Sequence, residues 1–156
     1  FLVRRLRRRQ RSSAMELVRR TEIAAEVYKA WYLTQLDVRN HNCGMFVAEA
    51  ASKLTGKKYA TGVTKKGTPK DKVEKFLARN EGAEKYLDTH FSRIAPLEAL
   101  PCDIIQFPSP DEKLPSLGLA LGNGEVAAFA DPGNGEAPIL VAARVLEDGL
   151  TAWRVG

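Results

Sequence analysis

The sequence contains few of the residues that build metal sites and disulfide frameworks. Among its 156 residues are two cysteines, Cys43 and Cys102, and two histidines, His41 and His90. Two cysteines cannot form a framework of several disulfides, and these four residues are not spaced like the ligands of a structural zinc site. The sequence therefore predicts neither a bound metal nor a cofactor.

Long apolar runs are also missing, although 44% of the residues are hydrophobic. No stretch approaches the roughly 20 apolar residues that a membrane-spanning helix needs, so no membrane span is predicted. The length and the apolar fraction are instead typical of one globular domain with its own core.

Acidic residues are absent from the first fifteen positions, where six arginines lie between Arg4 and Arg11. Without these arginines the chain has 18 basic and 19 acidic residues, so the remainder is nearly neutral. We predict a basic arm over residues 1–13, outside the core, with residues 1–12 contacting a neighbouring chain. A solvated, frayed terminus is the alternative. Nucleic-acid binding is a weaker one, because the rest of the chain shows no basic surface interleaved with aromatic residues.

A first helix is predicted from about residue 14 to residue 34, where apolar and aromatic residues repeat at helical spacing. Ser13 and Glu16 match a capping box, in which a serine accepts from the helix and a glutamate three residues later reaches back. This motif predicts that the helix begins after the basic arm, at the start of a single domain over residues 14–156.

The segment from Cys43 to Gly56 carries the clearest helical pattern in the chain. Asn42 is the predicted N-cap, and Gly56 suits the left-handed residue that ends many helices. The following residues share one apolar face: Cys43, Phe46, Val47, Ala50, Ala51 and Leu54. We expect this face to be buried between the first helix and a sheet, together with Trp31 and Ile105.

Two more helices and then a sheet are predicted after this segment. Thr68 and Pro69 indicate a helix start with proline at the first helical position. The buried side of that helix is expected to be Val73, Phe76 and Leu77, and a short helix is expected within residues 81–91. Apolar runs predict strands at 103–107, 117–121, 125–129, 139–141 and 152–155, with a hairpin around Gly122-Asn123-Gly124. Helices followed by a mainly antiparallel sheet indicate an α+β fold.

Cys43 lies at the first turn of its predicted helix, where the helix dipole favours a thiolate. A nucleophilic cysteine also needs a base, usually a histidine. His41 is two residues before the cysteine, and His90 precedes the sheet. A free cysteine on an apolar helix face is more often a small core residue, so that interpretation stands beside the nucleophile.

The order of these segments resembles the NlpC-type superfamily of papain-like cysteine peptidases, and more closely a family of phage tail proteins built on that fold. The segments that carry the resemblance are 42–50 with its end at Thr55-Gly56, C-D-I-I at 102–105, L-G-L-A-L-G at 117–122, and A-W-R-V at 152–155. The resemblance covers about residues 16–156. It implies an NlpC-type topology, with N-terminal helices packed on a small sheet.

The departures from the family pattern concern the catalytic residues. Active members resemble H-V-G-I-Y-L-G at the glycine strand, and their histidine is the general base. Here Ser116 stands at that position, and a serine hydroxyl has no useful basicity near neutral pH. Asn42 replaces the aspartate before the cysteine, and Cys102 replaces a glycine. The resemblance therefore implies that Cys43 occupies the nucleophile position without its usual base. His41 and His90 remain as weak candidates for that base.

Two functions follow from the resemblance. The first is a structural component of a phage tail tip or baseplate, made in the bacterial cytoplasm and assembled into the virion with other tail or baseplate proteins. The alternative is an active cysteine peptidase or amidase that cuts peptidoglycan during phage entry, with Cys43 as nucleophile and an unconventional base.

Overall fold

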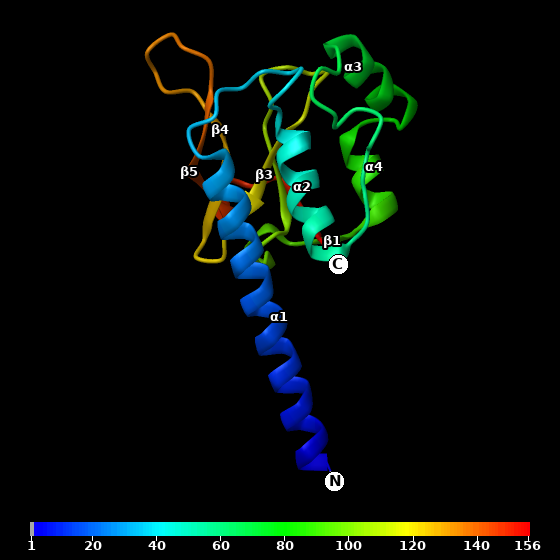
Figure 1. Ribbon diagram of the computed structural model, residues 1–156, viewed down its shortest axis with the longest axis vertical. Coiled ribbons are helices and arrows are strands. Elements are labelled where there is room, and N and C mark those ends of the chain that lie inside the picture. The colour runs from blue at the N-terminus through cyan, green and yellow to red at the C-terminus, as the bar shows by residue number, and fades with distance from the viewer. Residues whose placement is uncertain (1) are drawn as a thin grey trace.

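The computed structural model describes residues 2–156, which form helices and one antiparallel sheet (Figure 1). The helices are α1 (Leu2–Trp31), α2 (Cys43–Thr55), α3 (Lys70–Arg79) and α4 (Ala83–His90), with short 3-10 helices η1 (Pro96–Glu98) and η2 (Leu146–Asp148). The strands are β1 (Ser92–Ile94), β2 (Ile104–Phe107), β3 (Ser116–Ala120), β4 (Glu125–Ala130), β5 (Ile139–Val145) and β6 (Thr151–Arg154). Their spatial order is β1-β6-β2-β3-β4-β5, with antiparallel neighbours throughout. The predicted α+β class is confirmed.

The hairpin around Gly122-Asn123-Gly124 is present and joins β3 to β4. Leu119 pairs with Ala127, and both Gly122 and Gly124 have positive φ angles, as a tight turn requires. Beyond the turn, β4 continues into β5 through a longer loop and carries a register shift between Val126 and Ala128. Strand β1 was not predicted, because three residues are too few to show an alternation. It forms by pairing with β6.

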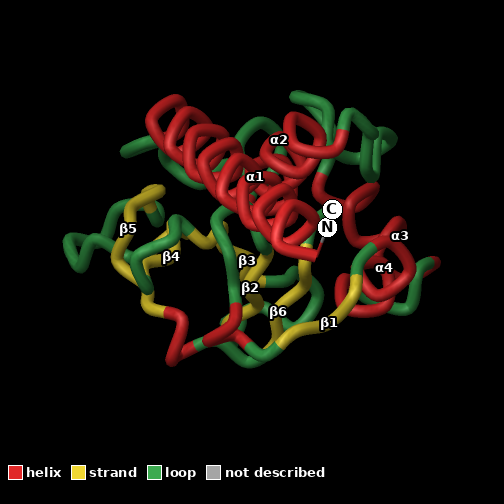
Figure 2. The backbone as a smooth tube through the Cα atoms, turned by 90° about the horizontal axis from the view of Figure 1, so that it is seen from below, coloured by secondary structure: helices red, strands yellow, loops and turns green. Residues whose placement is uncertain are grey.

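Helices α1 and α2 cover one face of the sheet (Figure 2). The caps of α2 are as predicted: the Asn42 side chain accepts from the Met45 backbone N–H, and Gly56 has a φ of 73°. The fully buried residues of its apolar face include Phe46 and Ala50, which pack with Ala24 and Val27 of α1. Helix α2 is therefore a core element, as its apolar periodicity indicated.

Ile105 does not belong to this core, so that part of the prediction is wrong. Successive strand residues point to opposite faces of a sheet, and it is Ile104 that faces α1 and α2. Ile105 packs in a second cluster on the other face, together with Phe107, Val126 and Leu146. The sheet is thus buried on both sides, by helices on one face and by the segments around η1 and η2 on the other.

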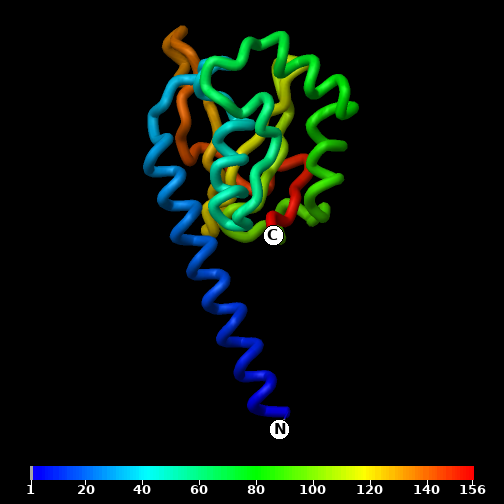
Figure 3. Tube along the Cα trace, turned by 45° about the vertical axis from the view of Figure 1, so that its right-hand side comes forward, coloured from blue at the N-terminus to red at the C-terminus, as the bar shows by residue number. Residues whose placement is uncertain are grey.

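The start of α1 also differs from the prediction. The helix begins at Leu2 and runs without interruption through Ser13, which therefore caps nothing. Residues 2–19 are all exposed, and this part of α1 projects away from the rest of the molecule (Figure 3). Arginine is a good helix former, so the arm continues the packed part of α1 toward the N-terminus as one helix. At the other end α1 stops at Trp31 rather than at residue 34. Among residues 2–156, no helix is both long and apolar enough to span a bilayer.

Helix α3 begins at Lys70, with Pro69 at the capping position instead of the first helical position. Its predicted buried side is only half-buried: Val73, Phe76 and Leu77 each keep part of their surface accessible. These three side chains line a pocket instead of joining the closed core.

Candidate functional site

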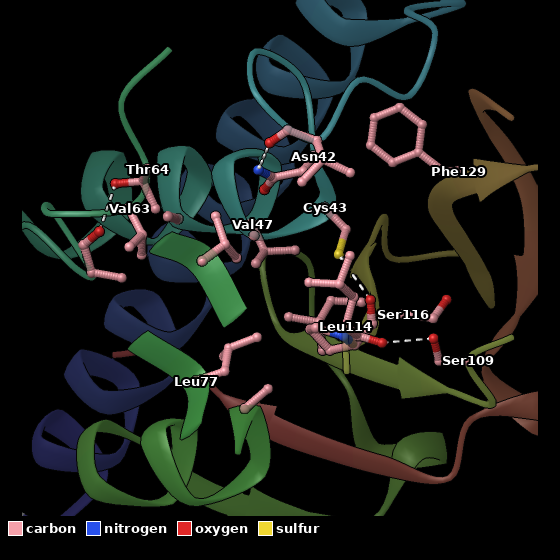
Figure 4. Close-up of a pocket in the computed structure, with 18 of the residues that line it drawn as sticks. Asn42, Cys43, Val47, Val63, Thr64, Leu77, Ser109, Leu114, Ser116 and Phe129 are labelled. Atoms are coloured by element: carbon pink, nitrogen blue, oxygen red, sulfur yellow. Dashed lines mark hydrogen bonds between the residues drawn. The ribbon is translucent and has the colours of Figure 1, made fainter. Parts of the chain in front are cut away.

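Cys43 is the first residue of α2, and local interactions hold it there. The Asn42 side chain accepts from Met45 N at 2.9 Å and donates from Nδ2 to the Val38 carbonyl at 2.9 Å. Asn42 therefore both caps the helix and ties its start to the preceding turn. The thiol is half-buried, and it points toward the start of β3 (Figure 4).

The Cys43 thiol donates to a backbone carbonyl rather than to a base. Its Sγ lies 3.4 Å from the Pro115 oxygen (Figure 4). Within residues 2–156 this is the hydrogen bond that the thiol donates, and none runs to a histidine. A thiol that donates to a carbonyl is held in its neutral form.

Burial raises the pKa of the Cys43 thiol above its ordinary value. Desolvation is the largest effect, and the backbone N–H groups of Leu117 and Gly44 oppose it. Desolvation therefore outweighs the effect of the helix N-terminus, which by itself favours a thiolate. The reason is that Cys43 lines a pocket with a mainly apolar wall, which includes Val47 and Leu117 and in which a negative charge is poorly solvated.

Within residues 2–156, neither histidine hydrogen-bonds the Cys43 thiol, and both rings pack against aromatic side chains. The His41 ring packs edge-on against Trp31, with ring centroids 5.5 Å apart. His90 ends α4, and its ring contacts Tyr86 at a tilt and Tyr59 edge-on, with ring centroids 4.6 and 5.6 Å apart. Among the described residues that line the pocket around Cys43, neither histidine appears.

Ser116, at the position that the resemblance assigns to a histidine, lies close to the cysteine. It opens β3 directly after Pro115, the residue that receives the thiol hydrogen bond, and it lines the same pocket as Cys43. The two residues that the resemblance pairs are therefore neighbours. The chemistry of the pair is nevertheless missing, because a hydroxyl does not accept a thiol proton at neutral pH.

A buried ion-pair network, which sequence reasoning missed, lies elsewhere on the sheet. Asp103 is fully buried, and its carboxylate accepts from Arg20 at 3.1 Å and from Arg154 at 2.7 Å. The same carboxylate accepts backbone N–H groups of Leu100 and Val155 at 2.8 and 2.9 Å. Arg20 also donates to the carbonyls of Pro101 and Val155. The network joins α1, the start of β2 and the end of the chain, so its role is structural.

A signal for this network was present in the sequence. Arg20 lies in helical register with Ala24, Val27 and Trp31, so it falls on the core-facing side of α1. A charged residue in such a stripe needs a buried partner. The strand at 103–107 begins with the matching aspartate.

A pocket of about 510 Å³ opens beside Cys43. Most of its wall is apolar or aromatic. The residues that α2, α3, α4 and the loop before α3 contribute include Val47, Tyr59, Val63, Phe76, Leu77 and Tyr86. In Figure 4, Val63 and Thr64 lie on one side of Cys43 and Phe129 on the other. Pockets of this size typically bind small molecules.

The comparison with known proteins gives a family but no function. No curated protein matches the chain. Residues 15–155 match the model of a family described as a domain of unknown function (DUF6950). Since this match spans most of the 156 residues, the chain belongs to that family.

Proposed function

We propose that this protein is a structural component of a phage tail tip or baseplate, built on a degenerate NlpC-type papain-like fold. In this proposal it is made in the bacterial cytoplasm and acts in the virion, where it packs against other tail or baseplate proteins. A fold retained without its chemistry is consistent with such a role, because folds and functions are separable.

The state of Cys43 is the observation that carries the proposal. The thiol lies at the helix start that the resemblance assigns to a nucleophile, yet it donates to the Pro115 carbonyl and its pKa is raised. Ser116 occupies the position of the base. A cysteine peptidase needs a group that takes the thiol proton and returns it to the leaving amine, which typically contributes 10²–10⁴-fold in rate.

The projecting part of α1 supports a role in assembly. Residues 2–19 are exposed on every side, with Leu2, Leu6 and Leu17 among the large apolar residues left open to solvent. A helix that leaves both apolar and arginine side chains exposed is suited to contact a neighbouring chain. We therefore propose that residues 1–12 bind an adjacent subunit.

The enzymatic alternative rests on one observation: the half-buried Cys43 thiol adjoins an open pocket that a substrate could enter. In that alternative the protein is a cysteine peptidase or amidase acting on peptidoglycan. It would require a base that moves to the sulfur when substrate binds.

Mass spectrometry of purified tail particles tests the structural proposal. We expect the protein to be present in a constant ratio to other tail proteins. Because the thiol has no part in assembly, particles carrying Cys43→Ala should assemble and infect as well as the wild type. Absence of the protein from particles would refute the proposal.

A cleavage assay separates the two candidates. Purified protein is incubated with peptidoglycan fragments that carry stem peptides, and the products are separated by chromatography. We expect no cleavage. Cleavage that is lost in Cys43→Ala and kept in the matched Cys102→Ala variant would instead establish the peptidase.

A further inference from the structure

The pocket beside Cys43 has a mainly apolar wall with few polar groups free to bind a ligand. Its polar side chains already have partners within the protein. Asn42 is bonded to Met45 and Val38, the Thr64 hydroxyl donates to the Ala60 carbonyl at 3.0 Å, and the Ser109 hydroxyl donates to the Leu114 carbonyl at 2.7 Å.

Two further polar groups of the wall are satisfied in the same way. The Tyr86 hydroxyl accepts from Ala60 N at 2.7 Å, and the Cys43 thiol donates to Pro115. The exceptions are the Ser116 hydroxyl, which makes no hydrogen bond within residues 2–156, and the Arg144 guanidinium, which lies over the Phe107 ring. A ligand that brings several amide groups would leave most of them unpaired, at about 1–3 kcal/mol each. A hydrocarbon chain brings none, so the wall favours an aliphatic ligand over a peptide.

The loop that closes one side of the pocket is strongly basic. Together with Lys70, the first residue of α3, this loop over residues 57–69 contains five lysines and no acidic residue, and all five lysines are exposed. Lys58 and Lys65 directly adjoin the wall residues Tyr59 and Thr64 in the chain. Four of the lysines make no ion pair within the described chain: Lys57, Lys58, Lys65 and Lys66.

The acidic residues of the pocket do not cancel this charge. Asp111 is paired with Lys70, with an N···O distance of 3.6 Å. Asp131 lines the pocket two residues after Phe129 in the chain, and Figure 4 shows Phe129 on the opposite side of Cys43 from Val63. The side of the pocket formed by the 57–69 loop is therefore positive, and it complements an anion.

From this apolar wall and basic rim, we propose that the pocket binds a single-chain anionic amphiphile. The aliphatic chain lies between α2, α3 and α4 and reaches toward Cys43. The anionic head group lies at the lysines of the 57–69 loop. This binding site is independent of whether the protein is a tail component, and it requires no reaction at the thiol.

Titration calorimetry of the full chain with two amphiphiles tests the proposal. Dodecanoate and dodecyltrimethylammonium share the same chain and differ in head-group charge. Below the concentrations at which they form micelles, we expect one saturable site for dodecanoate and binding about tenfold or more weaker for the cation. Equal binding of the two would refute the role of the lysines. No saturable binding of dodecanoate would refute the site.

Variants locate the chain and the head group. Val63→Trp and Leu77→Trp each fill the pocket from a half-buried position. Each should weaken dodecanoate binding by about tenfold or more, as expected when an apolar pocket loses room for a methylene group. Leu97→Trp, at an exposed residue outside the pocket, is the control and should have no effect. Lys65→Glu combined with Lys66→Glu should remove the preference for the anion.

Alkylation of Cys43 gives a second readout in the same protein. Saturating dodecanoate should slow the reaction of Cys43 with iodoacetamide, because the chain covers the sulfur. Binding that neither protects Cys43 nor responds to both pocket-filling variants would place the amphiphile elsewhere and refute the proposal. Binding of an acidic, leucine-containing peptide in place of dodecanoate would identify a protein partner and also refute it.

Discussion

At Cys43, a helix N-terminus and burial act on the same thiol in opposite directions. The dipole of α2 and the nearby N–H groups stabilise a thiolate, by about 0.3–1 kcal/mol for an exposed group at such a position. Desolvation opposes them and is the larger effect, so the pKa of Cys43 is raised. Position at a helix start is therefore not enough to activate a cysteine when its surroundings are apolar.

The first prediction concerns the reactivity of the two thiols. Because only the thiolate is alkylated, the raised pKa should make Cys43 react slowly with iodoacetamide at pH 7, and faster as the pH rises toward that pKa. Cys102, which is fully buried and whose pKa is raised to about 12, should stay unmodified in the native protein. Mass spectrometry of each cysteine-containing peptide measures both rates.

Denatured protein is the control, since both thiols should then react alike. Rapid alkylation of native Cys43 below pH 7 would contradict this prediction and would indicate that a base contacts the sulfur.

The second prediction concerns Asp103, the residue on which the buried network converges. Asp103→Ala removes the buried carboxylate from Arg20 and leaves it only the half-exposed Glu16 as an ion-pair partner, and breaking a buried pair in this way costs about 3–5 kcal/mol of unfolding free energy. Glu26→Ala removes an exposed pair with Lys53 and should have a much smaller effect. Urea unfolding of both variants makes the comparison. Equal losses would show that the Asp103 network is not a stabilising element.

At the scale of elements, the middle of the sheet depends on one glycine. Gly118 lies in β3, opposite Ile105 of β2. A Cβ at this position would lie 2.6 Å from Val126 Cγ1 and 2.9 Å from the Ala127 carbonyl oxygen. The backbone of β4 thus lies against the face of Gly118 at Ala127, where a side chain would have no room. Gly118 is therefore needed for the packing of β3 on β4, and this requirement does not depend on any reaction at Cys43.

The third prediction follows from that close approach. Gly118→Ala should lower the unfolding free energy by about 1–3 kcal/mol, because the added methyl group must displace a neighbouring strand. Gly62→Ala is the matched control: it lies in open space, and its effect should stay within about half a kcal/mol. Urea unfolding measures both. A Gly118→Ala variant as stable as the wild type would mean that β4 can move away at little cost.

At the scale of the whole molecule, α1 forms both the projecting arm and part of the packed domain. Residues 2–19 are exposed, whereas Arg20, Ala24 and Val27 are buried against the sheet and α2. The boundary between arm and domain thus falls inside a continuous helix and is set by contacts, not by a break in secondary structure.

The fourth prediction places that boundary by truncation. A chain beginning at Met15 should keep its thermal midpoint within about 2 °C of the full chain, the shift that roughly half a kcal/mol produces in a domain of this size. A chain beginning at Thr21 also loses Arg20 and should unfold at a clearly lower temperature. Differential scanning calorimetry compares the three chains. A large drop on truncation to Met15 would show that the arm stabilises the domain.

The sequence alone was enough for the features that neighbouring residues determine. The caps at Asn42 and Gly56 and the turn at Gly122-Asn123-Gly124 each depend on a few adjacent residues, so a short stretch of sequence contains the whole interaction. The apolar periodicity of α2 likewise predicted its buried face. The same local reasoning failed at Ser13. A capping motif there does not set the helix start, because the arginine-rich residues before it also favour helix.

Tertiary structure alone decided how residues far apart in the chain meet. Ile104 and Ile105 are equally apolar, and only the pairing of β2 in the sheet determines which of them faces α2. The distance in sequence between Cys43 and either histidine likewise does not say where the rings lie, whereas the packing of His41 on Trp31 and of His90 on Tyr86 does. Burial and the pairing of Arg20 with Asp103, 83 positions apart, depend on the complete fold, because solvent is excluded only when every surrounding element is in place.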